Sequence, residues 1–470
     1  LDFGYTLLYY INCSKNFAVF RFTWLRDFNT DMHNTKFKDL PSVNQVMYHL
    51  NNLVSLNNDY VKYLIQSELE SLRVEITKNN LSKSRAQLLE HLIQKILIRT
   101  SPNLVNLING TGIVLHTGFG RAPFEAKKFR KIAKHISGYV NLEFDLESGE
   151  RGDRQSHVRE HISSICQSES SLVVNNNAAA VILSINSLAA NGEVIVSRGQ
   201  LVEIGGSFRI TDIIEKSGAT IREVGTTNRT NLNDYENAIN NNTKLILYVH
   251  TSNYTINGYT QSVPIKSLVK LGKKYNTPVM VDWGSGSFLD MKAIGVAQEN
   301  PISMIMKIKP DLLTFSGDKL VGGPQAGIIV GKKIFIDLSQ RNQLYRALRI
   351  DKINLCFLEH TLRTYKSSYH HSDNLSLQLL STPRSILKNR ARKIFKYQTN
   401  KRVKELGITI MDTYVEAGSG SLPENKIRSA ALAFSPRKRK VKELAHSFRC
   451  GSTPVVGYIN GNMFFIDLKA

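Results

Sequence analysis

The sequence predicts an α/β protein with one large, mostly parallel sheet, a small helical domain before it and a smaller α+β domain after it. The length of 470 residues suggests several domains, because a domain usually takes about 100 to 200 residues. With 42% hydrophobic and 21% charged residues and only 12 prolines, the chain can bury a core, which excludes collagen, low-complexity disorder and a disulfide-stapled miniprotein. Short β-rich runs also alternate with helical patterns between Asn109 and about Lys333.

The N-terminal part divides into a leader and a helical domain. Residues 1–31 carry many aromatic side chains without sustained periodicity, and the first methionine is Met32, so we expect an unstructured or non-native leader. Apolar residues recur at helical spacing from Leu40 onward, and the last helix is predicted over roughly Ser84 to Arg99. Residues 32–100 are therefore predicted to form an N-terminal helical domain.

The central part, residues 101–354, contains seven strand candidates separated by helical crossovers. They are SLVV at 171, EVIVS at 193, TIREV at 220, KLILYVH at 244, PVMVD at 278, DLLTFS at 311 and AGIIVG at 326. Strands joined by helical crossovers lie parallel in one sheet, so this part is predicted to hold the large sheet.

The C-terminal part, residues 355–470, follows a connecting helix predicted near residues 340–366. It ends in two segments of alternating character, SAALAFS at 429 and NMFFIDL at 462. These two strand candidates favour a smaller α+β domain.

The charge balance favours a polyanionic partner. Sixty-one Lys and Arg against 39 Asp and Glu leave a net charge of +22, which suits phosphate backbones because binding releases their counterions. Residues 384–404 hold nine Lys or Arg and no acid, and RKRKVK follows at 437. Nucleic acid is the first expectation and an anionic membrane the second, with a merely solvated basic surface as the alternative.

The cysteines and the apolar runs indicate a reduced, aqueous setting. Cys13, Cys166, Cys356 and Cys450 lie far apart without a C-x-x-C pair, and no His/Cys/Asp cluster has the spacing of a metal site. No window reaches 18 uncharged apolar residues. We therefore expect a cytoplasmic protein with no metal and no membrane partner.

One lysine stands out in the segment PDLLTFSGDKLVGGPQAGIIVG. A buried strand is predicted to end at Ser316, and Lys319 follows in the turn. A lysine at a rigid strand end can be partly desolvated, which makes its amine nucleophilic near neutral pH and suits Schiff-base chemistry. On this segment alone, a surface lysine in a tight turn is the simpler explanation.

Two further strand ends strengthen the chemical interpretation. Asp282 closes the apolar run VMVD, at the sheet edge where open α/β folds bind cofactors, and an acid there could keep the pyridine nitrogen of pyridoxal phosphate protonated. SLVVNNNAAAV places Asn175, Asn176 and Asn177 at a helix start, whose free N–H groups can hold a phosphate. Ser316 could add a hydroxyl. The alternative for Asp282 is that it only caps the following loop.

Ordered sequence blocks between Leu40 and Leu468 carry a family resemblance. They are INGTGIVLHTGFGRAPF, VNLEFDLESGERGDR, VNNNAAAV, SRGQLVEIGGSFRITDI, EVGTTNRT, VHTSNY, VDWGSGS, FSGDKLVGGPQAG, NQLYRALRIDK and TPVVGYINGNMFFIDL. Together they resemble bacterial selenocysteine synthase, the family of L-seryl-tRNA(Sec) selenium transferases.

The resemblance implies a fold-type-I pyridoxal-phosphate transferase that converts L-seryl-tRNA(Sec) to L-selenocysteinyl-tRNA(Sec) via a dehydroalanyl intermediate. It implies selenophosphate as the selenium donor, the helical domain as the part that grips the tRNA, and a ring-shaped homodecamer assembled from dimers. Lys319 matches the family's Schiff-base lysine. The cofactor-binding residues expected on this basis are Lys319, Asp282, Asn176, Asn177, Ala178, His250 and Ser316.

The second substrate that the resemblance implies is an anion, which makes arginines the candidate ligands. Selenophosphate is a small dense anion, and bidentate guanidinium groups suit such an anion better than ammonium groups. Arg346 and Arg349 are spaced to share one helix face, and Arg121 follows a glycine-rich loop. These three are the candidate anion ligands, and surface salt bridges are the alternative role for each.

The chain departs from the family pattern at a few positions. The family usually reads alanine where Gly110 stands, Asn-Leu where Gly118-Phe119 stand, and arginine at Thr255 and at Tyr458. Because Gly118 and Phe119 lie beside Arg121, we expect a looser anion-binding loop. The other changes concern peripheral contacts.

Two other functions share features with this chain. A related pyridoxal-phosphate lyase or aldolase acting on a free small amino acid or sugar acid would have the same catalytic core, but the helical domain and the net charge of +22 favour a tRNA substrate. A non-catalytic RNA-binding protein on the same fold is disfavoured by the intact Lys319 and Asp282.

Overall fold

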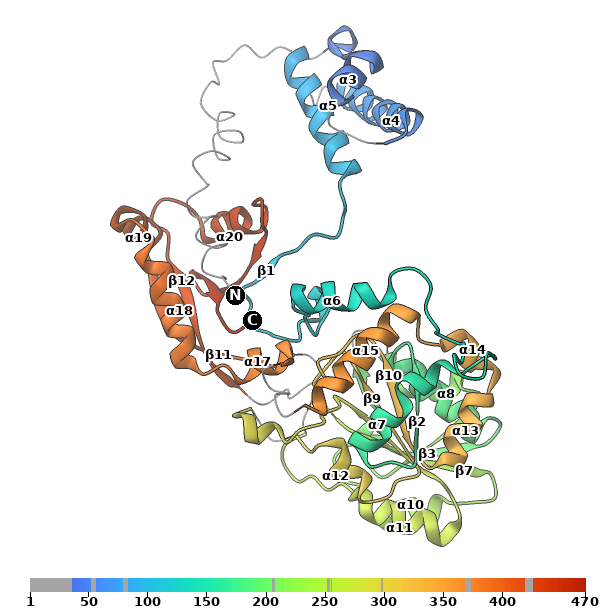
Figure 1. Cartoon of the computed structure of the whole chain (residues 1–470). Coiled ribbons are helices and arrows are strands. Elements are labelled where there is room, and N and C mark those ends of the chain that lie inside the picture. The colour runs from blue at the N-terminus through green and yellow to red at the C-terminus, as the bar shows by residue number, and fades with distance from the viewer. Residues whose placement is uncertain are drawn as a thin grey trace. The chain divides into compact units, whose positions relative to one another are not determined.

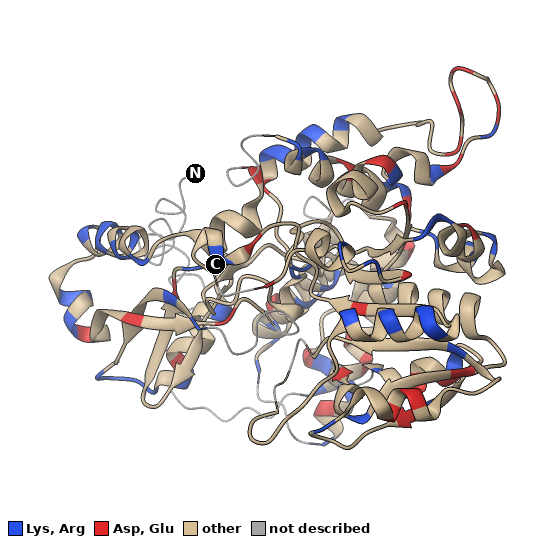
Figure 2. Cartoon of the chain, turned by 90° about the horizontal axis from the view of Figure 1, so that it is seen from below, with Lys and Arg blue, Asp and Glu red and all other residues tan. Residues whose placement is uncertain are grey.

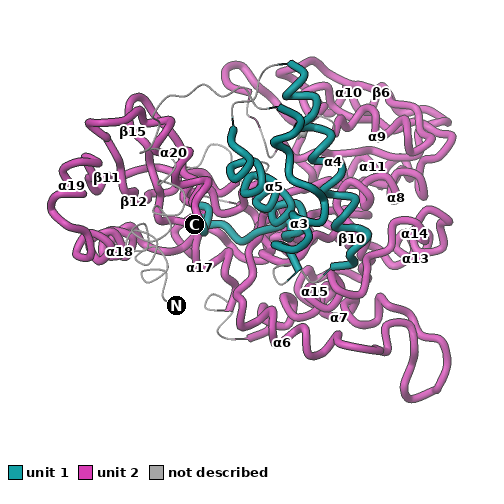
Figure 3. The backbone as a smooth tube through the Cα atoms, turned by 90° about the horizontal axis from the view of Figure 1, so that it is seen from above, with its two compact units in different colours: residues 1–108, 452–454 teal, residues 109–451, 455–470 magenta. Residues whose placement is uncertain are grey.

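The chain forms two compact units, each of which has its own apolar core. Unit 1 is residues 1–108 with 452–454, and unit 2 is residues 109–451 with 455–470 (Figure 3). The computed structural model describes residues 36–51, 56–78, 83–204, 208–251, 254, 256–296, 299–367, 373–418 and 426–470. The expected leader, residues 1–31, and the departure at Thr255 lie outside the described residues.

Unit 1 is helical, as the periodicity predicts. It comprises η2 (Phe37–Asp39), α3 (Val43–Leu50), α4 (Asn58–Thr77) and α5 (Arg85–Thr100). Each α-helix begins after a capping side chain, Ser42, Asn57 or Ser84, which accepts hydrogen bonds from backbone N–H groups of the first turn. The helices bury apolar residues spaced three and four apart, among them Leu88, Leu92 and Ile96.

Unit 2 is built on a seven-stranded sheet, and all seven predicted strands are confirmed (Figure 1). In spatial order the strands are β2 (Ser170–Val174), β10 (Gly327–Gly331), β9 (Leu312–Ser316), β8 (Val279–Gly284), β7 (Thr243–Val249), β3 (Glu193–Ser197) and β6 (Thr220–Val224). β10 is antiparallel to β2 and β9, whereas the pairs from β9 through to β6 are parallel.

Helices cover both faces of this sheet, which explains why its strands read as apolar runs. One face packs against α7 (Arg159–Cys166), α10 (Leu232–Ala238), α11 (Ile265–Tyr275), α12 (Ile302–Met306) and α15 (Lys352–Tyr365). The other packs against α8 (Asn177–Ala189), α9 (Ile210–Lys216) and α13 (Lys333–Arg341). Alternate strand residues serve the two cores: Ile246 faces the first, and Leu245 and Leu247 the second.

The two edges of the large sheet end differently. At β2, the Gln155 side chain pairs with Val173 as another strand would: its Nε2 donates to the Val173 carbonyl and its Oε1 accepts from the Val173 N–H, both at 2.9 Å. Gln155 lies in η4 (Arg154–His157) and is fully buried. At the opposite edge, β6 exposes the charged residues Arg222 and Glu223.

The C-terminal part of unit 2 is an antiparallel four-stranded sheet with helices, which confirms the α+β expectation. Its strands in spatial order are β11 (Ile408–Val415), β12 (Ile427–Phe434), β15 (Met463–Asp467) and β14 (Tyr458–Asn460). The accompanying helices are α17 (Leu375–Ser381), α18 (Arg384–Lys396), α19 (Asn400–Leu406) and α20 (Val441–Arg449).

Short elements complete the described residues. They are β1 (Ile108–Asn109), η3 (Thr117–Phe119), α6 (Ala126–Ile136), η5 (Arg198–Gln200), β4 (Glu203–Ile204), β5 (Phe208–Arg209), η6 (Met291–Ile294), α14 (Gln343–Leu348) and β13 (Val455–Val456). None of the helices in the described part combines the length and apolar character needed to cross a bilayer.

The single connecting helix predicted near residues 340–366 is wrong, because α13, α14 and α15 occupy that region. The side chains of Asn342 and Asp351 cap the starts of α14 and α15 by accepting first-turn N–H groups. α15 also crosses the domain boundary expected between residues 354 and 355, because its Leu355 and Leu358 pack on the large sheet.

Candidate active site

The carboxyl ends of four strands meet at one edge of the large sheet. β7, β8 and β9 run parallel, and β2 points the same way because β10 is antiparallel to both β2 and β9. The chain therefore brings together Asn177 after β2, His250 after β7, Asp282 near the end of β8 and Lys319 in the turn after β9. We call these four residues the strand-end cluster.

Asp282 is a buried carboxylate with two neutral donors. Its Oδ1 accepts from the Asn177 Nδ2 at 2.9 Å and from the Thr314 Oγ1 at 3.1 Å. Burial raises the pKa of Asp282, while these hydrogen bonds and the charge of Lys319 oppose that rise. These groups offset the rise only in part, so the position favours a protonated ligand nitrogen, which would add a cation beside the carboxylate.

Lys319 is held inside the protein at 5% exposure. Burial, helped by the positive charge of Arg121, lowers its pKa to about 8, although Asp282, Asp318 and Glu299 act in the opposite direction. A lysine with this pKa has an appreciable neutral fraction at neutral pH, which an ordinary surface lysine lacks. The turn that carries it is tight: Gly322 takes a positive φ of 67° and its N–H donates to the Lys319 carbonyl.

His250 lies flat on Trp283, with ring centroids 3.9 Å apart and planes inclined by 9°. Its backbone N–H donates to the Asp282 carbonyl at 2.9 Å, which fixes it beside β8. Burial lowers the pKa of His250, so its imidazole is neutral at neutral pH. Trp283 is itself held by Glu299, whose Oε1 accepts from the indole Nε1 at 2.8 Å and from the Ser285 hydroxyl at 2.6 Å.

The asparagine loop opens α8 as the sequence predicts. Asn176 caps the helix because its Oδ1 accepts from the Ala179 N–H at 2.9 Å. No hydrogen bond within the described residues takes the N–H of Asn177 or Ala178, so both point outward from the helix start. β10 passes close behind this loop, since a Cβ on Gly327 would overlap the Asn176 carbonyl oxygen.

Arg121 lies near the strand-end cluster. Its Nη1 is 3.4 Å from the Asp318 Oδ1, and the backbone N–H of Ala122 donates to the Asp318 carbonyl. Arg121 adopts a positive φ of 61° directly after Gly120 at 86°. In place of the looser loop that we expected, Phe119 stacks on His116 at 3.9 Å, and the N–H of Arg121 closes onto the His116 carbonyl.

Arg346 and Arg349 do not share a helix face, which corrects the spacing argument. α14 ends at Leu348, and Arg349 continues in an extended conformation with ψ at 137°. Its neighbour Leu348 accepts a backbone hydrogen bond from Asn175, which places this segment beside the end of β2. Arg346 is exposed, and no contact described here joins either arginine to Lys319 or Asp282.

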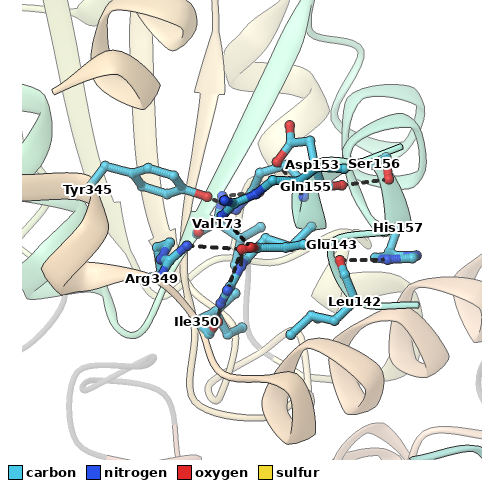
Figure 4. A network of polar contacts seen from close by, with 12 residues as sticks. Leu142, Glu143, Asp153, Gln155, Ser156, His157, Val173, Tyr345, Arg349 and Ile350 are labelled. Atoms are coloured by element: carbon cyan, nitrogen blue, oxygen red, sulfur yellow. Dashed lines mark hydrogen bonds and ion pairs between the residues drawn. The ribbon is translucent and has the colours of Figure 1, made fainter. Parts of the chain in front are cut away.

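Arg349 instead belongs to a network centred on Glu143 (Figure 4). The Glu143 Oε1 accepts from the Arg349 Nη1 at 3.0 Å and from the Arg154 Nε at 2.7 Å. The Arg154 hydrogen bond is the main reason why the pKa of Glu143 is lowered, with Arg349 adding to it. The Arg349 Nε is buried and has no hydrogen-bond partner among the described residues, so one donor of this guanidinium is unsatisfied.

Two of the departures from the family pattern are explained by packing. A Cβ on Gly110 would lie 2.9 Å from the Ile466 Cγ2, so glycine makes room for that side chain. Tyr458 stacks on Phe465, with centroids 5.1 Å apart. Both contacts are made with β15 of the C-terminal sheet, whose residues are far from the strand-end cluster in sequence.

The residues present fit pyridoxal phosphate. At these strand ends, three buried polar atoms have no partner among the described residues: the Oδ1 atoms of Asn175 and Asn177 and the Nδ1 of His250. Unpaired buried polar atoms are costly, and a polar ligand would relieve that cost. The buried Asp282 suits a ring nitrogen, the α8 start suits a phosphate and Lys319 suits an aldehyde. Ser316, 4% exposed at the end of β9, lines the same sheet edge.

Sequence reasoning missed the residues that support this cluster. Thr314 is a polar residue within a buried apolar strand, a signal that could have been used. Glu299 and Glu143 act through partners at least 8 residues away in the sequence, such as Arg151, Arg154 and Ser285, so no local pattern indicates them.

Comparison with known proteins gives one family. Residues 107–470 match the family described as L-seryl-tRNA selenium transferase (SelA). A protein of Desulfotalea psychrophila named L-seryl-tRNA(Sec) selenium transferase is 40% identical over 441 residues, covering 93% of this chain and 95% of the relative. A protein of the same name from Caldanaerobacter subterraneus subsp. tengcongensis is 41% identical over 438 residues, covering 92% and 94%. Both alignments are longer than unit 2, so they reach into unit 1.

Among solved structures, the fold is similar to that of D-glucosaminate-6-phosphate ammonia-lyase. The TM-score is 0.54 with 18% sequence identity, and the match covers 78% of this chain and 94% of that one. At this identity the similarity concerns the fold alone.

Proposed function

The chain belongs to the L-seryl-tRNA(Sec) selenium transferase family, and we propose that the strand-end cluster carries its reaction. The protein is a fold-type-I pyridoxal-phosphate enzyme that converts seryl-tRNA(Sec) to selenocysteinyl-tRNA(Sec). The observation that supports the proposal best is the buried lysine with a pKa near 8 beside a buried carboxylate, Asp282.

In this proposal each residue of the strand-end cluster has one role in binding or using the cofactor. When bound, pyridoxal phosphate supplies an electron sink for charge that develops on the substrate's α-carbon. Asp282 keeps the ring nitrogen protonated, and Asn177 and Thr314 hold the carboxylate in place. The N–H groups of Asn177 and Ala178, at the capped start of α8, hold the phosphate together with Ser316. His250, which is held by its stack on Trp283, would contact the ring of the bound cofactor.

Lys319 is the proposed proton carrier. Its Nζ would hold the aldehyde carbon of the cofactor in the resting enzyme and would be free for proton transfer once seryl-tRNA is bound. The neutral Nζ would then accept the α-proton and return it to the departing serine hydroxyl, which leaves as water to give a dehydroalanyl-tRNA. The pKa near 8 supports this role, because a general base works best when its pKa lies close to the working pH.

Selenium delivery is assigned to the arginines. We propose that selenophosphate is the donor and that Arg121, Arg346 and Arg349 bind its oxygens. The unsatisfied Nε of Arg349 and the exposed side chain of Arg346 support this role, although the Nη1 of Arg349 already pairs with Glu143. Arg346→Ala is therefore expected to slow selenium transfer by roughly 10- to 100-fold while water elimination continues, because a charge-assisted hydrogen bond contributes about 1.5 to 3 kcal/mol.

The partner proposals rest on unit 1 and on the basic charge. The helices of unit 1 form a separate core large enough to dock on RNA, and we propose that they grip the tRNA in the cytoplasm. We also propose a homodecamer built from dimers. Exposed apolar side chains on α13, Ile334 at 70% and Leu338 at 46% exposure, are consistent with subunit contacts, and sedimentation of the purified protein tests it.

Replacement of Lys319 tests the proposed reaction. The wild-type protein with pyridoxal phosphate should show a yellow absorbance band that borohydride removes, and Lys319→Ala should lack that band and all elimination activity. Lys307→Ala, an exposed lysine before β9, is the matched control and should keep both. A colourless wild-type protein in excess cofactor, or an active Lys319→Ala, would contradict the proposal. Activity on free serine but not on seryl-tRNA would favour a lyase instead.

A further inference from the structure

A cavity of about 880 Å³ lies in the C-terminal part of unit 2, apart from the strand-end cluster. It is bounded by the residues after η6, the junction of α17 and α18, the start of β12 and the end of the chain. Five cationic side chains line it: Arg384, Lys388, Lys426, Arg428 and Lys469. No residue of the strand-end cluster lines it.

The positive charge of this cavity is only partly neutralised. Arg384 and Lys388 share one acid, Asp412, at 3.0 and 2.7 Å. Lys426 and Arg428 are exposed, and neither has an ion pair within the part of the chain that the structure describes. Among the described residues, the ion pairs of these five cations involve one carboxylate, that of Asp412, which leaves the net positive charge expected for an anion site.

Lys469 adds a buried amine. It is 2% exposed, and its Nζ donates to the Thr382 carbonyl at 2.8 Å. Burial lowers its pKa to about 8, with the charge of Arg390 acting in the same direction and Asp467 opposing it. A buried ammonium beside a neutral carbonyl is stabilised by an anion, so this lysine also favours a negatively charged ligand.

The wall of the cavity is not purely basic. α18 starts at the cavity after Pro383, so its first N–H groups and the hydroxyl of Ser385 add donors. Leu380, Val296 and Ile427 contribute an apolar part. Cations and donors next to an apolar wall suit a molecule with a phosphate and a flat, poorly hydrated ring. The volume falls within the range of about 300 to 1,000 Å³ that is usual for ligand sites.

We propose that this cavity binds one nucleotide of the tRNA, with its phosphate on the five cations and its base against the apolar wall. Further cations lie along α18, which starts at the cavity: Arg392, Lys393 and Lys396 are exposed, and Figure 2 colours the Lys and Arg positions of the chain blue. A strand leaving the cavity therefore meets further cations, which favours RNA over a free nucleotide. The identity of the RNA rests on the proposed function, whereas the nucleotide class rests on the cavity alone.

The test is a charge-removing double variant of the full-length protein, Lys426→Ala/Arg428→Ala. Neither side chain has an ion pair in the described residues and both are exposed, so the fold should survive, and an unchanged cofactor band checks this. Lys266→Ala/Lys270→Ala on α11 is the matched control, because it removes the same charge from an exposed surface. Binding of tRNA(Sec) is measured over a range of salt concentrations, with AMP and inorganic phosphate as competing probes.

We expect the cavity variant to bind tRNA(Sec) at least 10-fold more weakly, with a log–log salt slope smaller by about one to two, since each phosphate contact adds roughly one to the slope. The control should stay within about twofold. AMP should compete better than phosphate against the wild type and lose this advantage in the cavity variant.

Equal tRNA affinity of the cavity variant and the control would overturn the tRNA assignment, even if AMP still binds. Equal competition by phosphate and AMP would overturn the nucleotide class. Failure of the wild type to bind tRNA(Sec) would instead refute the proposed function.

Discussion

At the scale of single residues, the surroundings of Asp282 and Lys319 account for most of the candidate chemistry. Both side chains are buried at the ends of neighbouring strands, and burial shifts their pKa values toward each other. The sequence allowed both residues to be found, because carboxyl ends of parallel strands share one edge. Thr314 and Glu299 escaped prediction, since their roles depend on contacts that only the folded chain creates.

The lowered pKa of Lys319 leads to a pH prediction. Only the neutral amine reacts with the aldehyde of pyridoxal phosphate, and with a pKa of about 8 the neutral fraction rises about tenfold between pH 7 and pH 9. The rate at which the yellow band forms in cofactor-free protein should follow this rise and then level off. Stopped-flow absorbance across pH 6 to 10 measures it.

Arg121 provides the control for that profile. Its charge lowers the pKa of Lys319, so Arg121→Gln should move the midpoint to higher pH, whereas Arg121→Lys keeps the charge and should move it much less. A wild-type midpoint above pH 10, or a midpoint that does not shift when Arg121 is replaced by Gln, would refute the electrostatic account.

At the scale of elements, the strands of the large sheet were predictable and the helix junctions were not. Each strand is buried on both faces and so reads as a short apolar run. The helix junctions at Asn342 and Asp351 depend on side-chain caps. Because the sequence analysis did not identify these caps, it predicted one helix where the structure has three. The same oversight placed Arg349 on a helix, although the chain leaves α14 before that residue.

Gln155 offers a test of how an element is anchored. Gln155→Leu keeps the side-chain size but leaves the N–H and carbonyl of Val173 unpaired in the interior. The free energy of unfolding should fall by about 2 kcal/mol or more, since an unsatisfied buried group costs about 1 to 3 kcal/mol. Urea unfolding measures it. Ser156→Ala removes a neighbouring exposed hydroxyl and should change stability by less than about 0.5 kcal/mol. Equal stability of the two variants would argue against strand pairing by Gln155.

At the scale of the whole molecule, the separate cores of the two units imply separable tasks. Every proposed contact to the cofactor lies in unit 2, and the family match begins at residue 107. The composition indicated a polyanionic partner but could not assign it to a unit, because basic residues occur throughout the chain.

Removal of residues 1–106 should therefore separate the tasks. The truncated protein should keep the yellow band, because the core of unit 2 is intact, and should lose its preference for tRNA(Sec) over tRNA(Ser). Residual RNA binding should be unselective and should weaken steeply with salt. Filter binding with both tRNAs measures this. A truncated protein that still selects tRNA(Sec) would move recognition into unit 2.

The two edge strands of the large sheet also affect whether copies of this chain can aggregate by strand pairing. An open edge strand invites the backbone of another molecule and can seed aggregation. Here Gln155 already occupies the hydrogen-bonding positions of Val173 on β2, and a second chain would have to expel it. On β6, an incoming strand would meet the charged Arg222 and Glu223. A neighbouring copy must therefore attach through other surfaces, and Gln155→Leu, by opening one edge, should make the protein more prone to form insoluble, strand-paired assemblies.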